Sequence, residues 1–267
     1  LLDRVLRPLR LELINAGGGL ALGRVGAGAE RAKTYAVADL ARGDAASLAE
    51  TVSMLLPDLR ARVAADGADG LRVNGPASAH MEVAVLCERL RKARGLKARS
   101  RYPAELLRVE PALAALDSRL ARRTTFSFVT YTPLAEVITY WRRASGLALV
   151  VDWGALAGAE LHPDTPIACS VVDRPWREAL DSVLGGVGLV WIAVDGRTLQ
   201  ITTAADRRAT IEFYPVATEA DARELERVAI ELPEAETHYD SASGSLIIRA
   251  TAGGHRAVWA QVRGGSE

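Results

Sequence analysis

The chain has 267 residues, which is long enough for two or more folded domains. Of these residues 49% are hydrophobic and 25% are charged, a composition typical of folded domains. Lysine and arginine together number 33, as do aspartate and glutamate, so the net charge is zero. This balance argues against a nucleic-acid partner, because affinity for nucleic acid comes mainly from neutralising phosphates. No uninterrupted apolar run of about 18 residues is present, so no segment is expected to insert into a membrane.

Residues 1–31 repeat the pattern of a later segment. LLDRVLRPLRLELINAGGGLAL aligns with ALDSVLGGVGLVWIAVDGRTLQI, so that Leu2, Val5 and Leu6 match Leu180, Val183 and Leu184. The repeat predicts a helix followed by a hairpin that turns at residues 17–19. No signal peptide is visible and the chain begins within the predicted helix, so we expect a fragment in which residues 1–31 are the end of a truncated domain.

Residues 32–96 predict a domain with the element order β-α-β-β-α. KTYAVADL opens it as a strand. Alternating and helical periodicities then predict a helix, two strands and a second helix, in that order, at residues 45–56, 60–65, 71–74 and 77–91. Residues 97–122 follow as a linker, in which Leu113, Leu116 and Leu120 indicate a helix that covers an apolar surface.

Residues 123–208 predict one complete small domain. Phe126 and Phe128 alternate with polar neighbours in a first strand, and a helix follows with the apolar stripe Leu134, Val137, Ile138 and Trp141. Strands are predicted at residues 147–151 and 167–172. Pro175 then opens a second helix whose apolar face is Trp176, Ala179, Leu180, Val183 and Leu184. Asp195-Gly196 joins two last strands as a hairpin.

Residues 209–267 repeat the β-α-β-β-α design of residues 32–96. Three pairs of apolar positions match between the copies, namely Tyr35 with Tyr214, Leu71 with Leu246 and Val83 with Val258. We therefore expect the two copies to superpose. The predicted fold class is α+β, with tandem small two-layer sandwiches of βαββαββ and βαββα order.

Three pieces of residues 124–203 resemble a known family. They are TPLAEVITYWRRASGLALVVD, DTPIACSVVDRPWREALDSVLGGVGLVWI and DGRTLQIT. They resemble the short N-terminal (STN) domain that secretins share with TonB-dependent receptors. The opening Tyr-x-Val-x-Asp-Leu of residues 35–40 resembles the ring-forming repeat domains that follow it in secretins, whereas the second copy has Thr218-Glu219 in place of Asp39-Leu40. The resemblance implies a periplasmic or cell-envelope location and no catalytic residues.

No set of reactive residues converges in the sequence. Cys87 and Cys169 fall in different predicted domains and are expected to be buried thiols. His80 and His255 recur at the same helical position without ligand-spaced partners, so a structural or surface role is favoured over a metal site. His162 and Asp164 precede the strand of Cys169, and a loop is favoured over a catalytic group. We predict no catalytic residue, cofactor or metal.

The resemblance to secretin domains implies protein–protein interaction or assembly in the cell envelope, with self-association into a ring as one form of it. Trp153, in a predicted loop, is expected either to cap the sheet core, which is favoured, or to serve as a contact residue, for which it is the best aromatic candidate. Leu246, Ile247 and Ile248 form a strand that is apolar on both faces, and as an edge strand it would pair with a partner; as a central strand it would not. A stand-alone scaffold or binding protein that reuses these domains without an outer-membrane channel is the alternative.

Overall fold

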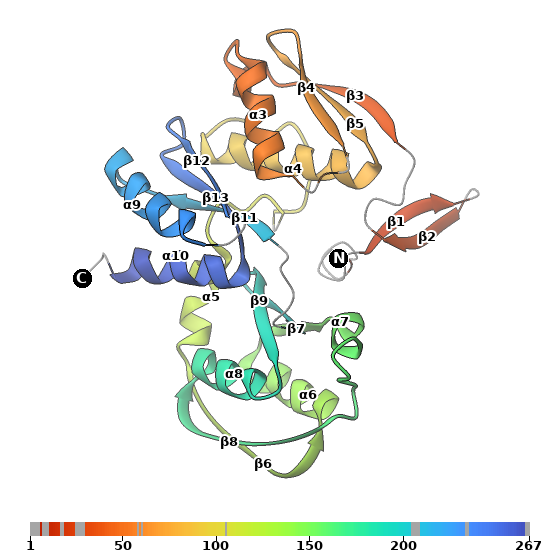
Figure 1. Cartoon of the computed structure of the whole chain (residues 1–267), viewed down its shortest axis with the longest axis vertical. Coiled ribbons are helices and arrows are strands. Elements are labelled where there is room, and N and C mark those ends of the chain that lie inside the picture. Colours follow the sequence, from red (N-terminus) through yellow and green to blue (C-terminus); the bar gives the residue numbers. More distant parts are fainter. Residues whose placement is uncertain are drawn as a thin grey trace. The chain divides into compact units, whose positions relative to one another are not determined.

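The computed structural model describes residues 6, 11–16, 19–24, 30–57, 59, 61–104, 106–203, 209–232 and 235–264. The chain forms two compact units, unit 1 from Leu1–Pro111 with Ala209–Glu267, and unit 2 from Ala112–Arg208 (Figure 1). In unit 1, strands β1 (Leu11–Ala16) and β2 (Gly19–Arg24) pair antiparallel, so the predicted hairpin is confirmed. Most of the helix predicted before it, including Leu2 and Val5, lies outside the described residues.

The first repeat module, residues 31–93, follows the predicted order. Its elements are β3 (Arg31–Ala36), α2 (Ala38–Ala41), α3 (Ala45–Leu55), β4 (Arg62–Asp66), β5 (Gly70–Gly75) and α4 (Ala77–Ala93), with the sheet order β3-β5-β4. Helix α3 begins where the Asp44 carboxylate accepts a hydrogen bond of 2.9 Å from the Ser47 amide. The four-residue helix α2 has no counterpart in the sequence prediction, because it is too short to show a helical period.

The second repeat module, residues 209–264, has the same order and pairing. It contains β11 (Ala209–Pro215), α9 (Glu219–Ile230), β12 (Glu236–Asp240), β13 (Ser245–Thr251) and α10 (Ala252–Gly264), with the sheet order β11-β13-β12. Tyr35 pairs with Leu71 across β3 and β5, and Tyr214 pairs with Leu246 across β11 and β13. Val83 and Val258 are both completely buried. The predicted equivalence of these positions is confirmed.

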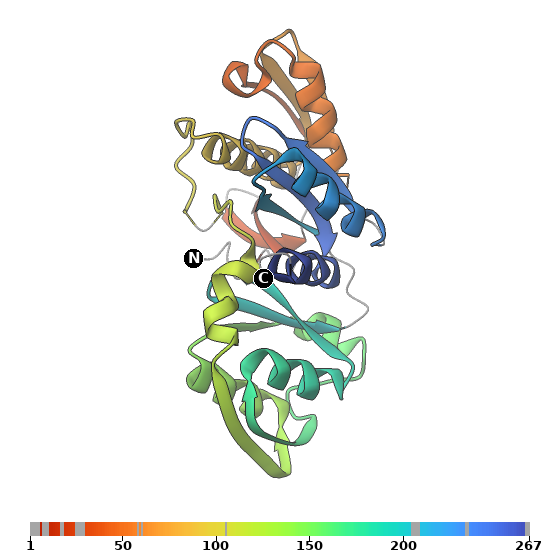
Figure 2. The same cartoon turned by 90° about the vertical axis from the view of Figure 1, so that its left-hand side faces the viewer.

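The two repeat modules share part of their core within unit 1. Phe213 and Ile247 of the second module belong to the same apolar cluster as Val52, Leu55 and Leu90 of the first. Helix α3 contacts strand β12, and the two views show α3 beside the strands of the second module (Figures 1 and 2). The sheet of the second module therefore has its own helices on one face and the first module on the other.

Unit 2 begins with α5 (Ala112–Leu120), whose predicted apolar positions Leu113, Leu116 and Leu120 are buried; this helix packs on α8 and β9. The remaining elements are β6 (Arg123–Pro133), α6 (Leu134–Ser145), β7 (Ala148–Val151), α7 (Trp153–Ala157), β8 (Pro166–Pro175), α8 (Trp176–Gly185), β9 (Leu189–Asp195) and β10 (Thr198–Thr203). Strands β6 and β8 form one sheet, and β7-β10-β9 form another. Helices α6 and α8 contact strands of both sheets and lie between them (Figure 1).

The helices of unit 2 follow their predicted apolar stripes. Leu134, Val137, Ile138 and Trp141 of α6 are buried, as is the stripe of α8 that includes Leu180. Helix α6 ends at Gly146, whose φ of 70° is a left-handed conformation that glycine adopts without strain. Both helices contact a sheet on each of two sides, so each needs apolar side chains on both sides. Trp141 of α6 and Trp176 of α8 supply them toward β6, where both rings contact Phe126.

The fold class α+β is confirmed, with one refinement. The sequence predicted two-layer sandwiches, whereas unit 2 has three layers, because its helices are covered by a sheet on each side. Periodicity shows which residues are buried, but it does not show how many sheets the strands divide into. Among the described helices, none is both long and apolar enough to cross a membrane.

Candidate protein-interaction surface

Strands β6 and β8 of unit 2 form a sheet with two open edges. They pair antiparallel, with Phe126 opposite Val171 and Phe128 opposite Cys169. Within the part of unit 2 that the structure describes, no third strand joins them. Each strand therefore presents one row of backbone N–H and C=O groups along its outer edge, and such rows can pair with a strand of another chain.

The middle of this sheet is free of charge and partly apolar at its surface. Residues 125–133 and 166–172 contain no lysine, arginine, aspartate or glutamate. Val129, Tyr131 and Val172 are 86%, 79% and 70% exposed, among the most exposed large apolar side chains in the described residues. Edge strands usually have charged side chains that discourage pairing, and this pair of strands has none in these segments.

A bulge in β6 contains two of the exposed side chains, Val129 and Tyr131. Phe128 lies opposite Cys169 and Thr132 lies opposite Ile167, so three residues of β6 span the place of one residue of β8. Val129 and Tyr131 lie one and three residues after the inward-facing Phe128, so strand alternation places them on the side away from the helices. Apolar surface therefore lies on the outside of the sheet at the bulge.

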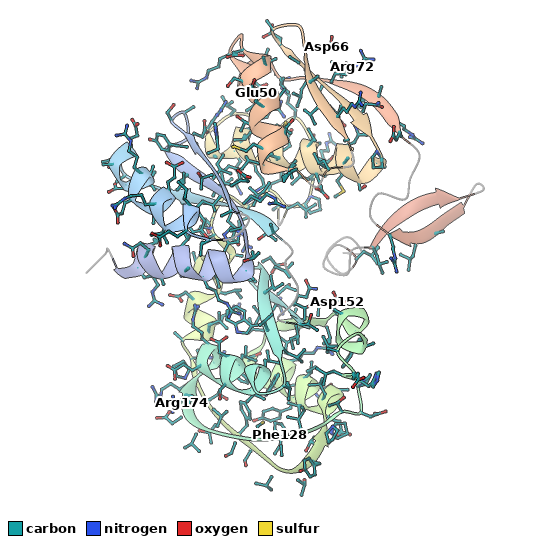
Figure 3. All side chains as sticks on the ribbon, in the orientation of Figure 1. Glu50, Asp66, Arg72, Phe128, Asp152 and Arg174 are labelled. Carbon is teal, nitrogen blue, oxygen red and sulfur yellow. The ribbon has the colours of Figure 1, made fainter. Side chains whose placement is uncertain are left out.

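An aromatic cluster supports the sheet from its inner side. The ring of Phe126 stacks on Trp176 at a centroid distance of 5.7 Å, and Phe128 meets Tyr140 edge to face at 5.5 Å. Phe128 is labelled beside β6 in Figure 3. Because α6 and α8 hold these rings, the exposed residues of β6 stand on packed elements rather than on a long loop.

Charged side chains gather at one end of the sheet. Arg123 of β6 donates to the Asp173 carboxylate over 2.7 Å, and Arg174 of β8 pairs with Glu178 over 3.1 Å. Arg174 is labelled at this end in Figure 3. Both pairs are well exposed, so they limit the uncharged stretch at this end and contribute little to stability.

The predicted contact strand is not at an edge. Leu246, Ile247 and Ile248 are completely buried, and β13 is the central strand between β11 and β12. Its backbone groups are occupied on both sides, so the interpretation as an edge strand is corrected. A strand that is apolar on both faces proves here to be a strand covered on both faces.

Trp153 lies elsewhere on unit 2 and is half-buried. It is the first residue of α7, a helix that the sequence interpretation took for a loop. Asp152 caps this helix by accepting a hydrogen bond of 3.1 Å from the Ala155 amide. The role of Trp153 as a contact residue stays a prediction.

The two recurring histidines hold the first strand of each repeat module to its last helix. The Nδ1 atoms of His80 and His255 lie 3.0 and 2.9 Å from the hydroxyl groups of Tyr35 and Tyr214. Each Nε2 lies 2.9 Å from a backbone carbonyl oxygen at the start of the first strand of its module. Among the described residues, no group of three or more histidine, cysteine, aspartate or glutamate side chains could hold a metal ion.

The cysteines and the predicted loop residues form no nucleophilic site in the described residues. Burial raises the pKa of the Cys87 thiol to about 12, and burial also raises the pKa of Cys169, so neither forms a thiolate readily. His162 and Asp164 are exposed in a turn before β8, in which the Thr165 hydroxyl oxygen accepts from the His162 amide at 2.7 Å.

The sequence interpretation missed the surface residues Val129, Tyr131 and Val172. A signal was present, since the segment from residue 125 to residue 133 alternates like a strand and holds no charge. Alternation from Phe126 and Phe128 places Val129 and Tyr131 on the outer face, whereas the bulge that contains them depends on the pairing with β8 and leaves no mark in the periodicity.

Comparisons with known proteins give limited similarity. No family model and no curated protein matches the chain. A solved structure described as XcpQN012 has 17% identity over 53% of this chain and 65% of its own chain, with a TM-score of 0.22. A dimeric mutant of the N-terminal domain of the secretin XcpQ from Pseudomonas aeruginosa has 18% identity over 53% of this chain and 63% of its own, with a TM-score of 0.21. The chain thus spans less than two thirds of the length of either structure. It is similar in part to N-terminal domains of a secretin, and at these scores its function has to rest on its own residues.

Proposed function

We propose that this chain is a non-enzymatic module that binds other proteins in the bacterial cell envelope, in the manner of the periplasmic N-domains of secretins. In this proposal residues 123–208 are a complete STN-like domain and residues 1–31 are the end of another. Residues 32–96 and 209–267 are ring-forming-type repeats, and residues 97–122 connect the repeat to the STN-like domain. Support comes from the three sequence pieces that resemble the STN domain and from the paired repeat modules.

The observation that supports protein binding most directly is the uncharged sheet of β6 and β8. Its open edges offer backbone hydrogen bonds, and Val129, Tyr131 and Val172 offer apolar contact beside them. Strand addition needs these two features, because main-chain bonds supply affinity and neighbouring side chains supply selectivity. The occupant that fits is an extended, uncharged segment of a partner protein, since a charged segment would find no counter-charge in residues 125–133 or 166–172.

Site-specific photocrosslinking in cells tests this proposal. A photoreactive residue is placed at Val172 in one variant and at Ile230 of α9 in another, because both side chains are exposed to a similar extent, 70% and 68%. We expect a discrete crosslinked protein from position 172 and none of that mass from position 230. The crosslink should map to an extended, uncharged segment of the partner.

Charge insertion is the second arm of the experiment. Val129→Lys in the same cells should abolish the crosslink at position 172, because a buried ammonium group without a partner is costly. Ile230→Lys is the matched control and should leave it intact. Equal crosslinking at both positions, or a crosslink that survives Val129→Lys in a chain that still folds, would contradict the proposal.

A further inference from the structure

The contact between the two repeat modules within unit 1 combines an apolar patch with two arginines. The guanidinium group of Arg89 lies 4.6 Å above the ring of Phe213. Its Nη1 donates to the carbonyl oxygen of Ile211 over 2.9 Å, and its Nε donates to that of Arg108 over 2.8 Å. Arg89 therefore fastens helix α4 of the first module to strand β11 of the second.

The second arginine forms a two-pronged ion pair across the same contact. Arg94, at the end of α4, donates from Nε and Nη2 to the two carboxylate oxygens of Asp240 over 3.0 and 2.8 Å. Its Nη1 donates to the carbonyl oxygen of Leu40 over 2.8 Å. Burial alone would raise the pKa of Asp240, but the hydrogen bonds from Arg94 and Ser243 and the nearby positive charges hold it below its usual value. Asp240 thus stays ionised and paired with Arg94 down to acidic pH.

His238 lies on the same side of β12 as Asp240. The two residues are two positions apart on one strand, and side chains two apart share a face. His238 pairs with Ile247, which belongs to the core shared with the first module. Because paired residues of neighbouring strands share a face, the His238 ring faces the first module. It is half-buried there.

Several charges surround this ring. The negative charge of Asp240, on the same strand, raises the pKa of the ring, and the positive charge of Arg94, in the first module, lowers it. The other charged groups on β12, β13 and α3 are Glu236, Arg249 and Glu50. Helix α9 also packs against β12, but on the opposite face, where its Glu226 accepts a hydrogen bond from Thr237. Within the described residues no carboxylate forms a hydrogen bond with the ring, and Arg94 already occupies both oxygens of Asp240. A proton added to His238 would therefore place a second positive charge beside Arg94 without a new partner.

We propose that the contact between the two repeat modules is a pH-sensitive latch, closed while His238 is neutral and weakened when the ring takes up a proton. Opening the latch would uncover Phe213 and Ile247, which are completely buried in the closed form. Acidification would thereby expose an apolar sheet face that is hidden at neutral pH.

The direction of the pH effect follows from the electrostatics of the closed form. Burial lowers the pKa of His238 below its ordinary value; Asp240 opposes this shift and Arg94 adds to it. In the open form the ring regains its ordinary value of about 6.5. The closed form then binds fewer protons than the open form. The free energy that favours the closed form is therefore fully present above pH of about 6.5 and declines as the pH falls below that value. At pH 5.5 the opening constant should be about tenfold higher than at pH 7.5, provided that the closed-form ring stays neutral.

Distance measurement between spin labels on the full chain tests the latch. Labels are attached after Arg72→Cys in the first module and Arg223→Cys in the second, both exposed positions, in a chain with Cys169→Ser. Cys87 is buried with a raised thiol pKa and stays unlabelled. We expect one short distance at pH 7.5 and a longer one whose share relative to the short one grows about tenfold at pH 5.5, measured in urea below the unfolding midpoint.

Two histidine variants separate this latch from general acid sensitivity. His238→Asn should remove the pH response, whereas His80→Gln, which changes a histidine in the first module, should retain it. If His238→Asn does not fold, the wild-type slope of log opening constant against pH still decides the matter, because one proton taken up gives a slope that approaches about one below pH 6.5. A slope of zero, a response that survives His238→Asn, or no second distance at any urea concentration below unfolding would overturn the proposal.

Discussion

The two repeat modules have the same core and opposite outer faces. In both, a tyrosine of the first strand binds a histidine of the last helix, and that histidine reaches back to a carbonyl oxygen four residues before the tyrosine. A carbonyl oxygen only accepts, so Nε2 must hold a proton in both modules. The matching contacts show that the repeat includes a polar bond as well as apolar packing.

The outer faces differ at equivalent positions. Thr34 and Arg72 of the first module are exposed, and Arg72 stands on the open sheet face in Figure 3. Their counterparts in the second module are Phe213 and Ile247, which are completely buried against the first module. The shared core pattern specifies the fold of each module, and the outer-face residues specify which module is covered. The predictions below exchange or remove these differences, starting with the largest effect.

Phe213→Ala should have the largest effect. Loss of a buried phenylalanine leaves a cavity in the shared core, and we expect unfolding of unit 1 to become easier by about 3–5 kcal/mol. The counterpart Thr34→Ala removes one exposed hydrogen bond to Asp66 and should cost below about 1 kcal/mol. Denaturant titrations of both variants measure the difference. Equal losses would show that the two outer faces are covered alike.

Asp240→Asn should come next. The change leaves the guanidinium of Arg94, whose side chain is 11% exposed, without its counter-charge, and we expect a loss of about 1.5–3 kcal/mol, the range for hydrogen bonds to charged groups. Asp66 occupies the matching position in the first module, and there Asp66→Asn should cost about 0.5 kcal/mol or less, because exposed charges contribute little. Thermal unfolding of the two variants checks this. A neutral result for Asp240→Asn would mean that the ion pair does not hold the modules together.

Tyr214→Phe should have a smaller effect. Without the hydroxyl group, His255 and the buried Glu212 lose a hydrogen-bond partner, and we expect a loss of about 1–3 kcal/mol. Tyr35→Phe removes the equivalent bond from a half-buried site, where water replaces it, so its cost should be below about 1 kcal/mol. Hydrogen exchange of β11 and β3 would compare the two. The prediction would be wrong if Tyr35→Phe proved the more damaging change.

Lys33→Gln should have the smallest effect. The Lys33 ammonium lies 4.8 Å from the centroid of the Tyr35 ring, whereas the second module has Glu212 at the matching position. An exposed cation–π contact is worth about 0.5–1 kcal/mol, so the loss should stay near the lower figure. Denaturant midpoints with and without 1 M salt measure it. A larger loss in the absence of salt would indicate an ion pair of Lys33 rather than a contact with the ring.

Much of the fold was predictable from local sequence patterns. The stripe Leu134, Val137, Ile138 and Trp141 predicted a helix, and the alternation of Ile167, Cys169 and Val171 predicted a strand; both predictions are confirmed. The internal repeat also predicted that Tyr35 matches Tyr214 and that Leu71 matches Leu246, and each tyrosine does pair with the leucine of its own module. These features depend on which side chains of one element share a face, and that relation is written in spacing along the chain.

The candidate site and the module contact depend on the tertiary structure. Ile247 was predicted to be in a strand, but the position of that strand at the centre of its sheet follows from pairing with two others. The open edges of β6 and β8 follow from the two-stranded sheet that they form in the described part of unit 2. His238 and Arg94 are separated by 143 intervening residues in the chain and meet only because the second module folds back onto the first. Spacing along the chain determines which face of an element is apolar, whereas the surface that covers this face is supplied by distant residues.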